Sequence, residues 1–370
     1  MKNLRYASLL LTLCAGFIFC ACSNMTDVEN EPFDHIGGYN AMNNKQSEKY
    51  YADLRAYKQQ AVNYGRPVAF GWYSNWSPAG TYRRGYLTSM PDSMDIVSMW
   101  SGAPNRFKIT PEQKADKEFV QKVKGTKLLE VTLLSYIGKG RTPDSIYTAV
   151  EKQAEKEGWA NDANRLNEAK KQARWKFWGF DGNVDSDSHK QALSRFAKAL
   201  CDWDGYDIDW EIGSGVFDMD GTLSRNEDLI YLVKEMNKYI GPKRDPDHKG
   251  HRLICIDGHI WSLTQALEGY VDYWIDQAYG RSTYYDQYGI DPKSIITTDN
   301  FESSFKTGGV LLRQAASMPT KGYKGGFGAY RFDNDYDNTP NYKWMRQAIQ
   351  INQKVFEDWK KNGTPYKSGN

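Results

Sequence analysis

Eight short runs rich in β-branched and aromatic residues recur along this chain, and they alternate with segments of helical character. Strands that alternate with helices favour a parallel sheet covered by helices. Eight runs are enough to close such a sheet on itself, so we predict an α/β protein with one (β/α)8 barrel, the TIM-barrel fold. A chain of 370 residues fits a single barrel of this kind. The expected strands are residues 68–73, 95–100, 127–134, 206–211, 253–257, 273–279, 294–298 and 326–332.

Helical patterns fall between these strands, at 111–124, 188–200, 223–240 and 342–359. The third pattern begins with a capping box, Ser224 to Glu227, and ends at Gly241-Pro242. Residues 138–187 are longer than a simple connection and carry several aromatic residues. We interpret them as an elaborated loop, whose aromatics either pack a helix on the barrel or line a glycan groove.

The N-terminus has the pattern of an export signal. Lys2 and Arg5 precede an apolar stretch at 7–19, and Cys22 follows a small residue. This arrangement resembles a bacterial lipoprotein signal, in which Cys22 would be lipidated; an uncleaved anchor helix is the alternative, but the apolar stretch is short for a span. We therefore predict a signal peptide at 1–21, a tether at 22–50 and a barrel at 51–370. The expected location is the bacterial outer membrane, at the cell surface.

Charge and cysteine content exclude some functions. The net charge of +2 gives no sustained field, so we expect no nucleic-acid partner. Cys201 and Cys255 are expected to be buried free thiols rather than a disulfide. The five histidines show no metal-ligand spacing, and we expect neither a metal nor a cofactor. Asp333, Asp335 and Asp337 alternate like the start of a calcium loop, but the glycine and closing acid are missing, so an acidic surface turn is expected.

The fourth expected strand concentrates acidic residues. In the run from Asp204 to Glu211, Asp207, Asp209 and Glu211 stand two residues apart. Side chains alternate on a strand, so these three share one face at steps of about 6.6 Å. Acids packed so closely in a partly dry cleft share protons, and at least one is expected to stay protonated near neutrality. Such a group can act as a general acid.

The run D-G-x-D-x-D-x-E resembles the active-site motif of glycoside hydrolase family 18, which includes chitinases and endo-β-N-acetylglucosaminidases. The resemblance implies substrate-assisted hydrolysis with retention. Glu211 would protonate the glycosidic oxygen while the 2-acetamido group of the sugar attacks the anomeric carbon. Asp209 would hold the acetamido N–H and Asp207 would bias the charge of Asp209. Asp204 is expected to be structural.

Further candidates lie on other strands. Gln277 and Tyr279 are expected at the carboxyl end of the sixth strand, where Tyr279 would bind the acetamido oxygen. The Gln-x-Tyr form resembles endoglycosidases that cut the chitobiose core of N-glycans, although Gln277 could equally be structural. Tyr330 and Trp72 are candidates for substrate binding. The predicted function is an endo-β-N-acetylglucosaminidase acting on N-glycans of glycoproteins, with glycan-uptake proteins as expected partners.

Other functions stay open at this stage. The same barrel could serve as a chitinase or as a lipoprotein receptor that binds glycans without cleaving them. Residues 217–223, F-D-M-D-G-T-L, resemble the first motif of haloacid-dehalogenase-type phosphatases. That motif belongs directly after a buried strand, and here it follows a glycine-rich entry, so a loop is the simpler interpretation.

Overall fold

The computed structural model describes residues 46–81, 83–100, 109–133, 141–183, 185–199, 203–211, 226–247 and 250–367. The predicted signal peptide with Cys22, the thiol of Cys201 and the segment 217–223 lie outside these residues. So does the predicted capping residue Ser224. None of the helices in the described ranges is both long and apolar enough to cross a bilayer.

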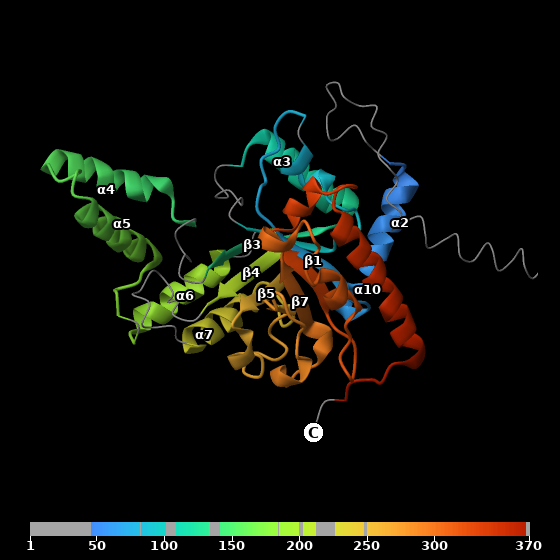
Figure 1. Ribbon diagram of the computed structural model, residues 1–370. Coiled ribbons are helices and arrows are strands. Elements are labelled where there is room, and N and C mark those ends of the chain that lie inside the picture. The colour runs from blue at the N-terminus through green and yellow to red at the C-terminus, as the bar shows by residue number, and fades with distance from the viewer. Residues whose placement is uncertain are drawn as a thin grey trace, which may run out of the picture.

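Eight parallel strands form a closed barrel in the order in which they occur along the chain, which confirms the predicted fold (Figure 1). The barrel closes where β1 pairs with β8, with Val68 opposite Gly326. Bulky and β-branched residues fit the pleated, doubly covered strands of such a barrel. The strands are β1 (Val68–Tyr73), β2 (Ile96–Met99), β3 (Lys127–Leu133), β4 (Gly205–Trp210), β5 (Leu253–Gly258), β6 (Tyr273–Asp276), β7 (Ile295–Asn300) and β8 (Gly326–Tyr330).

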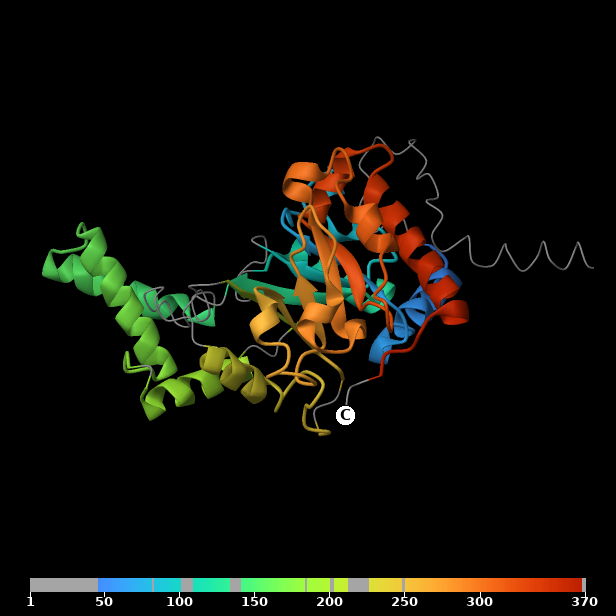
Figure 2. The ribbon, with the colours of Figure 1, turned by 60° about the horizontal axis from the view of Figure 1, so that its bottom comes forward.

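Helices surround the barrel on its outer side (Figures 1 and 2). Local capping fixes some of their ends: Thr110 forms a capping box with Gln113 at the start of α3. The α-helices of the described ranges are α2 (Glu48–Gln59), α3 (Pro111–Glu118), α4 (Asp144–Glu157), α5 (Ala163–Trp178), α6 (Asp187–Ala199), α7 (Asn226–Met236), α8 (Phe301–Ser304), α9 (Leu311–Ala316) and α10 (Lys343–Asn362). The first of these includes the last residues of the predicted tether.

The core has three parts. Alternate residues of the strands fill the barrel interior, among them Phe70, Trp72 and Ile275. Two further clusters pack the outer faces of the strands against the helices, one around α6 and α7 and the other around α9 and α10. Because every strand is covered on both faces, polar side chains inside the barrel are exceptions that call for a reason.

The sixth strand is shorter than predicted, and this corrects the placement of Gln277 and Tyr279. β6 ends at Asp276, whose carboxylate accepts hydrogen bonds from Thr283 and Arg281. The backbone N–H of Ala278 then donates to the carbonyl of Asp276. These hydrogen bonds to Asp276 form a turn that ends the strand despite the β propensity of the residues that follow. Gln277 and Tyr279 therefore lie on the connection after the strand.

Residues 138–187 are not simply an elaborated loop. Two helices, α4 and α5, form an antiparallel hairpin that projects from the side of the barrel (Figures 1 and 2). Trp178 and Phe180 are buried against α6, and Trp178 donates a hydrogen bond to Thr142. Packing is therefore the role of these two aromatics, while Phe177 is 40% exposed.

Candidate active site

The acidic strand β4 places its carboxylates inside the barrel, at the rim formed by the carboxyl ends of the strands. Asp207 and Asp209 are 0% and 2% exposed, whereas Glu211 follows the end of the strand and is exposed. Tyr206, Ile208 and Trp210 face the outer helices. The strand therefore presents two buried acids and one accessible acid on the face that alternation predicted.

Asp207 is held by two donors from β1 and β2, strands that do not pair with β4. Its Oδ2 atom accepts hydrogen bonds from Ser98 Oγ at 2.7 Å and from Trp72 Nε1 at 3.1 Å. Burial raises the pKa of Asp207 to about 7, while these two donors act in the opposite direction. Donors to a carboxylate favour its charged form, so Asp207 keeps some anionic character despite complete burial.

Asp209 lies beside two other acids. Burial, and then the charges of Glu211 and Asp207, raise the pKa of Asp209 to about 7. Its Oδ1 atom is buried and has no hydrogen-bond partner among the described residues. The acids thus share protons near neutrality, as the spacing predicted.

The structure adds Asp257, which the sequence analysis did not propose. Asp257 ends the apolar run of β5, pairs directly with Asp209 and is 1% exposed. Its Oδ2 accepts a hydrogen bond from Gln277 Nε2 at 3.2 Å. Burial, followed by the charges of Asp209 and Asp207, raises the pKa of Asp257 well above its ordinary value. An acid at the end of a buried apolar run was the available signal, whereas Asp209 was identified by its two-residue spacing from Asp207 and Glu211.

Gln277 and Tyr279 reach this site from the turn after β6. Both are half-buried. Burial, and then the charges of Asp257 and Asp209, raise the pKa of the Tyr279 phenol. Tyr279 therefore stays neutral and can donate a hydrogen bond across the physiological range.

Tyr330 ends β8 within a group of aromatic rings. Its ring centroid lies 6.2 Å from Trp72, 5.9 Å from Trp100 and 6.3 Å from Tyr279. Tyr330 is half-buried, but Trp72 is 1% exposed and its indole nitrogen is bound to Asp207. Trp72 thus offers almost no surface to a sugar ring, and we revise its expected role from binding substrate to supporting Asp207.

Asp204 lies at the opposite end of β4 from Glu211. Its Oδ2 accepts hydrogen bonds from Gln121 Nε2 at 2.6 Å and from the backbone N–H of Leu128 at 3.0 Å. These contacts tie the start of β4 to β3 and its preceding helix, which is the structural role expected for Asp204.

The acidic turn after β8 is not a surface turn, contrary to the prediction. Asp333 and Asp335 are buried, with backbone N–H groups of Ser74 and Met345 as donors, and Asp337 forms an ion pair with Arg84. Ser74, the donor to Asp333, follows β1 and is distant in the sequence, whereas Met345, the donor to Asp335, lies in the nearby helix α10. Within the described ranges, no group of three or more His, Cys, Asp and Glu side chains is arranged to hold a metal ion. Cys255 is a buried free thiol, as expected.

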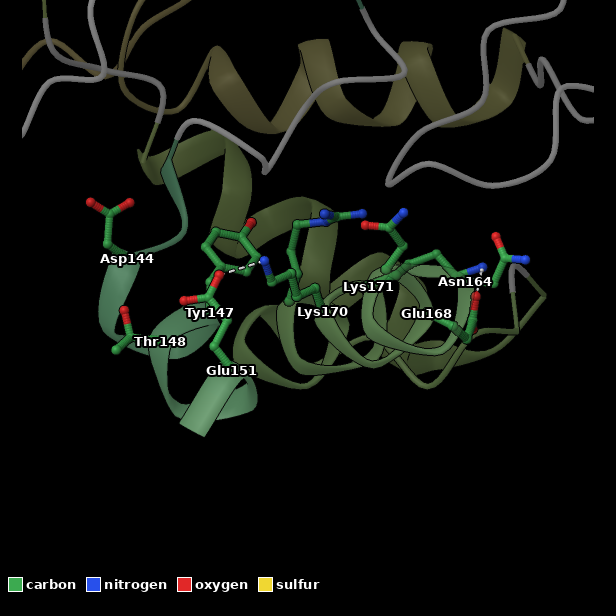
Figure 3. A pocket seen from close by; sticks show the side chains of 10 residues that line it. Asp144, Tyr147, Thr148, Glu151, Asn164, Glu168, Lys170 and Lys171 are labelled. Carbon is green, nitrogen blue, oxygen red and sulfur yellow. Dashed lines mark hydrogen bonds and ion pairs between the residues drawn. The ribbon is translucent and has the colours of Figure 1, made fainter. Parts of the chain in front are cut away.

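A cavity of about 890 Å³ lies on the α4–α5 hairpin rather than among the barrel acids (Figure 3). Lys170 of α5 reaches across it to Glu151 of α4 at 2.5 Å, and Lys171 pairs with Glu168. These basic groups are already neutralised by acids. The other lining residues are Asp144, Tyr147, Thr148, Asn164, Asn167 and Arg174.

A closed barrel with a cluster of carboxyl groups at the carboxyl ends of its strands is an arrangement that glycoside hydrolases use. The family model described as "Glycoside hydrolase family 18, BT1044-like" matches residues 26–305. The chain therefore belongs to glycoside hydrolase family 18, in its BT1044-like group. No curated protein matches the chain.

Solved structures similar to this chain include a glutamate-to-glutamine variant of BT1044 in selenomethionine form. It is 25% identical, with a TM-score of 0.62, and the match covers 84% of this chain and 93% of that one. The apo endo-β-N-acetylglucosaminidase from Cordyceps militaris is 17% identical, with a TM-score of 0.55 and coverage of 85% and 98%. A mutant of that enzyme in complex with fucosyl-N-acetylglucosamine-Asn is 16% identical, with a TM-score of 0.54 and the same coverage. The last two likenesses concern the fold.

Proposed function

We propose that this family 18 hydrolase is an endo-β-N-acetylglucosaminidase that cleaves the GlcNAc-β1,4-GlcNAc core of N-glycans. The observation that carries the proposal is the group formed by Asp209, Glu211 and Tyr279, in which a buried acid and a neutral phenol lie near an accessible carboxyl group. The names of the similar solved structures support the same class of substrate.

Each side chain has a distinct part in the proposed reaction. Glu211 protonates the glycosidic oxygen as the acetamido oxygen attacks the anomeric carbon, and the bond to the leaving sugar breaks. Asp209 accepts the acetamido N–H and offsets the positive charge of the oxazolinium intermediate, while Tyr279 donates to the acetamido oxygen. Water then attacks the anomeric carbon and returns a proton to Glu211. Gln277 and Tyr330 contact the substrate at the rim.

The test is release of glycans from glycoproteins that carry high-mannose, hybrid or complex N-glycans. Wild-type protein should leave a single N-acetylglucosamine on the asparagine, which mass spectrometry detects. Glu211→Gln should lower kcat by about a thousandfold or more and leave glycan binding measurable. As a control, Glu357→Gln removes an exposed carboxylate on α10 and should not change the rate.

Two alternatives make different predictions in the same assay. A non-catalytic receptor would bind N-glycans and release nothing from any class. A chitinase would cut chitin oligomers in preference to glycoproteins. Either outcome would replace the proposal.

We further propose that the protein is an exported lipoprotein anchored through Cys22 to the bacterial outer membrane. The apolar stretch before Cys22 supports this location. Metabolic labelling with a radioactive fatty acid should mark the wild-type protein and not Cys22→Ser. Protease added to intact cells should degrade the protein if it faces outward.

A further inference from the structure

Asp257 is a buried acid whose environment the reaction described above does not explain. It is 1% exposed and lies at the end of β5, where it pairs with Asp209 in the neighbouring strand. Paired residues of adjacent strands lie about 5 Å apart and point to the same face, so both carboxyl groups enter the same part of the barrel. A buried acid costs stability unless a partner satisfies it.

The hydrogen bonds of these two acids leave one oxygen of each unsatisfied. Oδ2 of Asp257 accepts from Gln277, while Oδ1 of Asp257 and Oδ1 of Asp209 are both buried without a partner among the described residues. Two carboxylate oxygens cannot satisfy each other without a proton between them. One proton shared between the acids would satisfy both oxygens and remove the repulsion between two like charges.

We propose that Asp257 is a positioning residue that keeps a proton and donates it through Oδ1 to Asp209, so that Asp209 carries the negative charge. This inference rests on the proposed function, because the charge on Asp209 is what the oxazolinium intermediate requires. It also assigns a second task to Asp257: its Oδ2 holds the amide of Gln277 at the rim.

The environment of each acid explains why the proton resides on Asp257. Asp207 has two donors, Ser98 and Trp72, which favour its charged form. Asp257 has one contact, at 3.2 Å, with an uncharged amide, and burial and the charges of Asp209 and Asp207 raise its pKa well above the ordinary value. Oδ1 of Asp209 has no donor among the described residues, so a proton on Asp257 supplies the donor that Asp209 lacks.

The charged groups around Asp257 disfavour its ionisation, and only the hydrogen bond from the Gln277 amide favours it. Asp207, Asp209 and Glu211 belong to β4 and its end. Tyr279 lies after β6 and Cys255 lies on the same strand as Asp257, and both of these groups respond to its charge. The titratable groups named here that surround Asp257 are therefore acidic or neutral, and they favour its protonated form.

Two variants at this position separate a hydrogen-bonding role from a packing role. Asp257→Asn keeps the volume, can donate to Asp209 and can accept from Gln277. Asp257→Leu keeps the branching at Cγ, is larger, and removes both contacts. We expect Asp257→Asn to retain kcat within about tenfold and Asp257→Leu to lose about a hundredfold, with KM changed little. Equal loss in both variants, or full activity in Asp257→Leu, would overturn the proposal.

A spectroscopic measurement decides the protonation state without an active enzyme. Full-length protein labelled with carboxyl-13C aspartate is measured at about pH 8, where Asp207 and Asp209 are mostly ionised, and its infrared band of protonated carboxyl groups should be weaker in Asp257→Asn by the intensity of one carboxyl group. Asp53→Asn, an exposed residue of α2, is the control and should leave the band unchanged. A band of equal intensity in wild type and Asp257→Asn would exclude the proton from Asp257, even if Asp257→Leu fails to fold. Inactivity of wild-type protein on all N-glycans would overturn only the proposed function, and the infrared result would still stand.

Discussion

Trp72 Nε1 donates a hydrogen bond to Oδ2 of Asp207 at 3.1 Å, from the strand that closes the barrel to the strand that carries the acids. These residues are 135 positions apart in the sequence. Through this hydrogen bond, an aromatic residue of the core stabilises a buried carboxyl group. The contact also shows that the acid cluster depends on a strand that does not pair with β4.

Removal of the second donor to Asp207 should change the pH dependence of the reaction. Ser98→Ala deletes the hydroxyl that favours the charged form, so the pKa of Asp207 should rise above about 7. The acidic limb of the kcat/KM profile should then move upward by about one pH unit. Profiles of wild-type and Ser98→Ala that superimpose would show that ionisation of Asp207 does not control the rate.

The phenol of Tyr279 should act on the transition state more than on substrate binding. Tyr279→Phe keeps the ring and removes the donor to the acetamido oxygen, so kcat should fall by about a hundredfold with little change in KM. Tyr284→Phe is a matched control, because Tyr284 is 65% exposed and lies a few residues further along the chain. A rise in KM at constant kcat would instead indicate uniform binding.

Gly258 lies where the backbone of β5 passes close to β4. Its φ of +93° is unfavourable for other residues, and a Cβ there would come within 2.2 Å of the Trp210 carbonyl oxygen and 3.3 Å of Asp209 Oδ1. Gly258→Ala should therefore displace the acids, and it should lower both the melting temperature and kcat.

Gly158→Ala is a control that has the backbone strain of Gly258→Ala without its close contacts. Gly158 has a φ of +77° and no neighbour within 4 Å of the added methyl group. The Gly158→Ala variant should lose only about 1–2 kcal/mol in the free energy of unfolding, because alanine is strained in the left-handed backbone conformation, and it should keep its activity. If the two variants behave alike, close packing at Gly258 is not important.

The acid cluster should make the protein less stable as the pH rises. Asp207 and Asp209 have pKa values of about 7 in the folded chain, above the value of about 3.9 for an unfolded aspartate. The folded state therefore binds more protons between these values, and this contribution to stability is complete below about pH 4 and is lost as the pH rises through about 7.

Melting temperatures measured between pH 5 and pH 8 test this relationship. Asp209→Asn removes one titrating group, so its melting temperature should fall less steeply over this range than that of the wild type. An equal or steeper decline in Asp209→Asn would place the linked protons elsewhere.

Lys324 stabilises the end of α9 from inside the fold. It is fully buried, and its Nζ donates to the carbonyl oxygens of Gln314, Ala315 and Ser317 at 2.7, 2.6 and 2.9 Å. Lys324→Met removes this donor from all three carbonyl groups, which should cost about 3 kcal/mol in the free energy of unfolding. Denaturant titration measures this loss, with exposed Lys321→Met as the control. A change below about 1 kcal/mol would contradict the capping role.

The sequence predicted the barrel well because each strand is a local pattern. All eight strands occur near their expected positions, and β1 has the predicted bounds of Val68–Tyr73. The largest error concerns β6, whose end depends on side chains from Thr283 and Arg281 that bind Asp276. Local β propensity does not depend on such side-chain contacts, so the predicted strand extended too far.

Within the candidate site, residues on one strand could be predicted and contacts between strands could not. The shared face of Asp207 and Asp209 follows from alternation along β4. The pairing of Asp209 with Asp257 depends on the register between strands that are separated by a long connection. Asp333 is likewise buried with a donor, Ser74, that lies 259 positions away, so the acidic run considered alone suggested a surface turn.

The sequence by itself determined the number of strands, the parallel arrangement and the face on which the acids of β4 lie, since these follow from periodicity over a few residues. Only the tertiary structure decided that Trp72 supports Asp207 and that Asp257 joins Asp209. The physical reason is that the charge of a buried acid depends on desolvation and on donors gathered from several strands, and closure of the barrel alone brings those together.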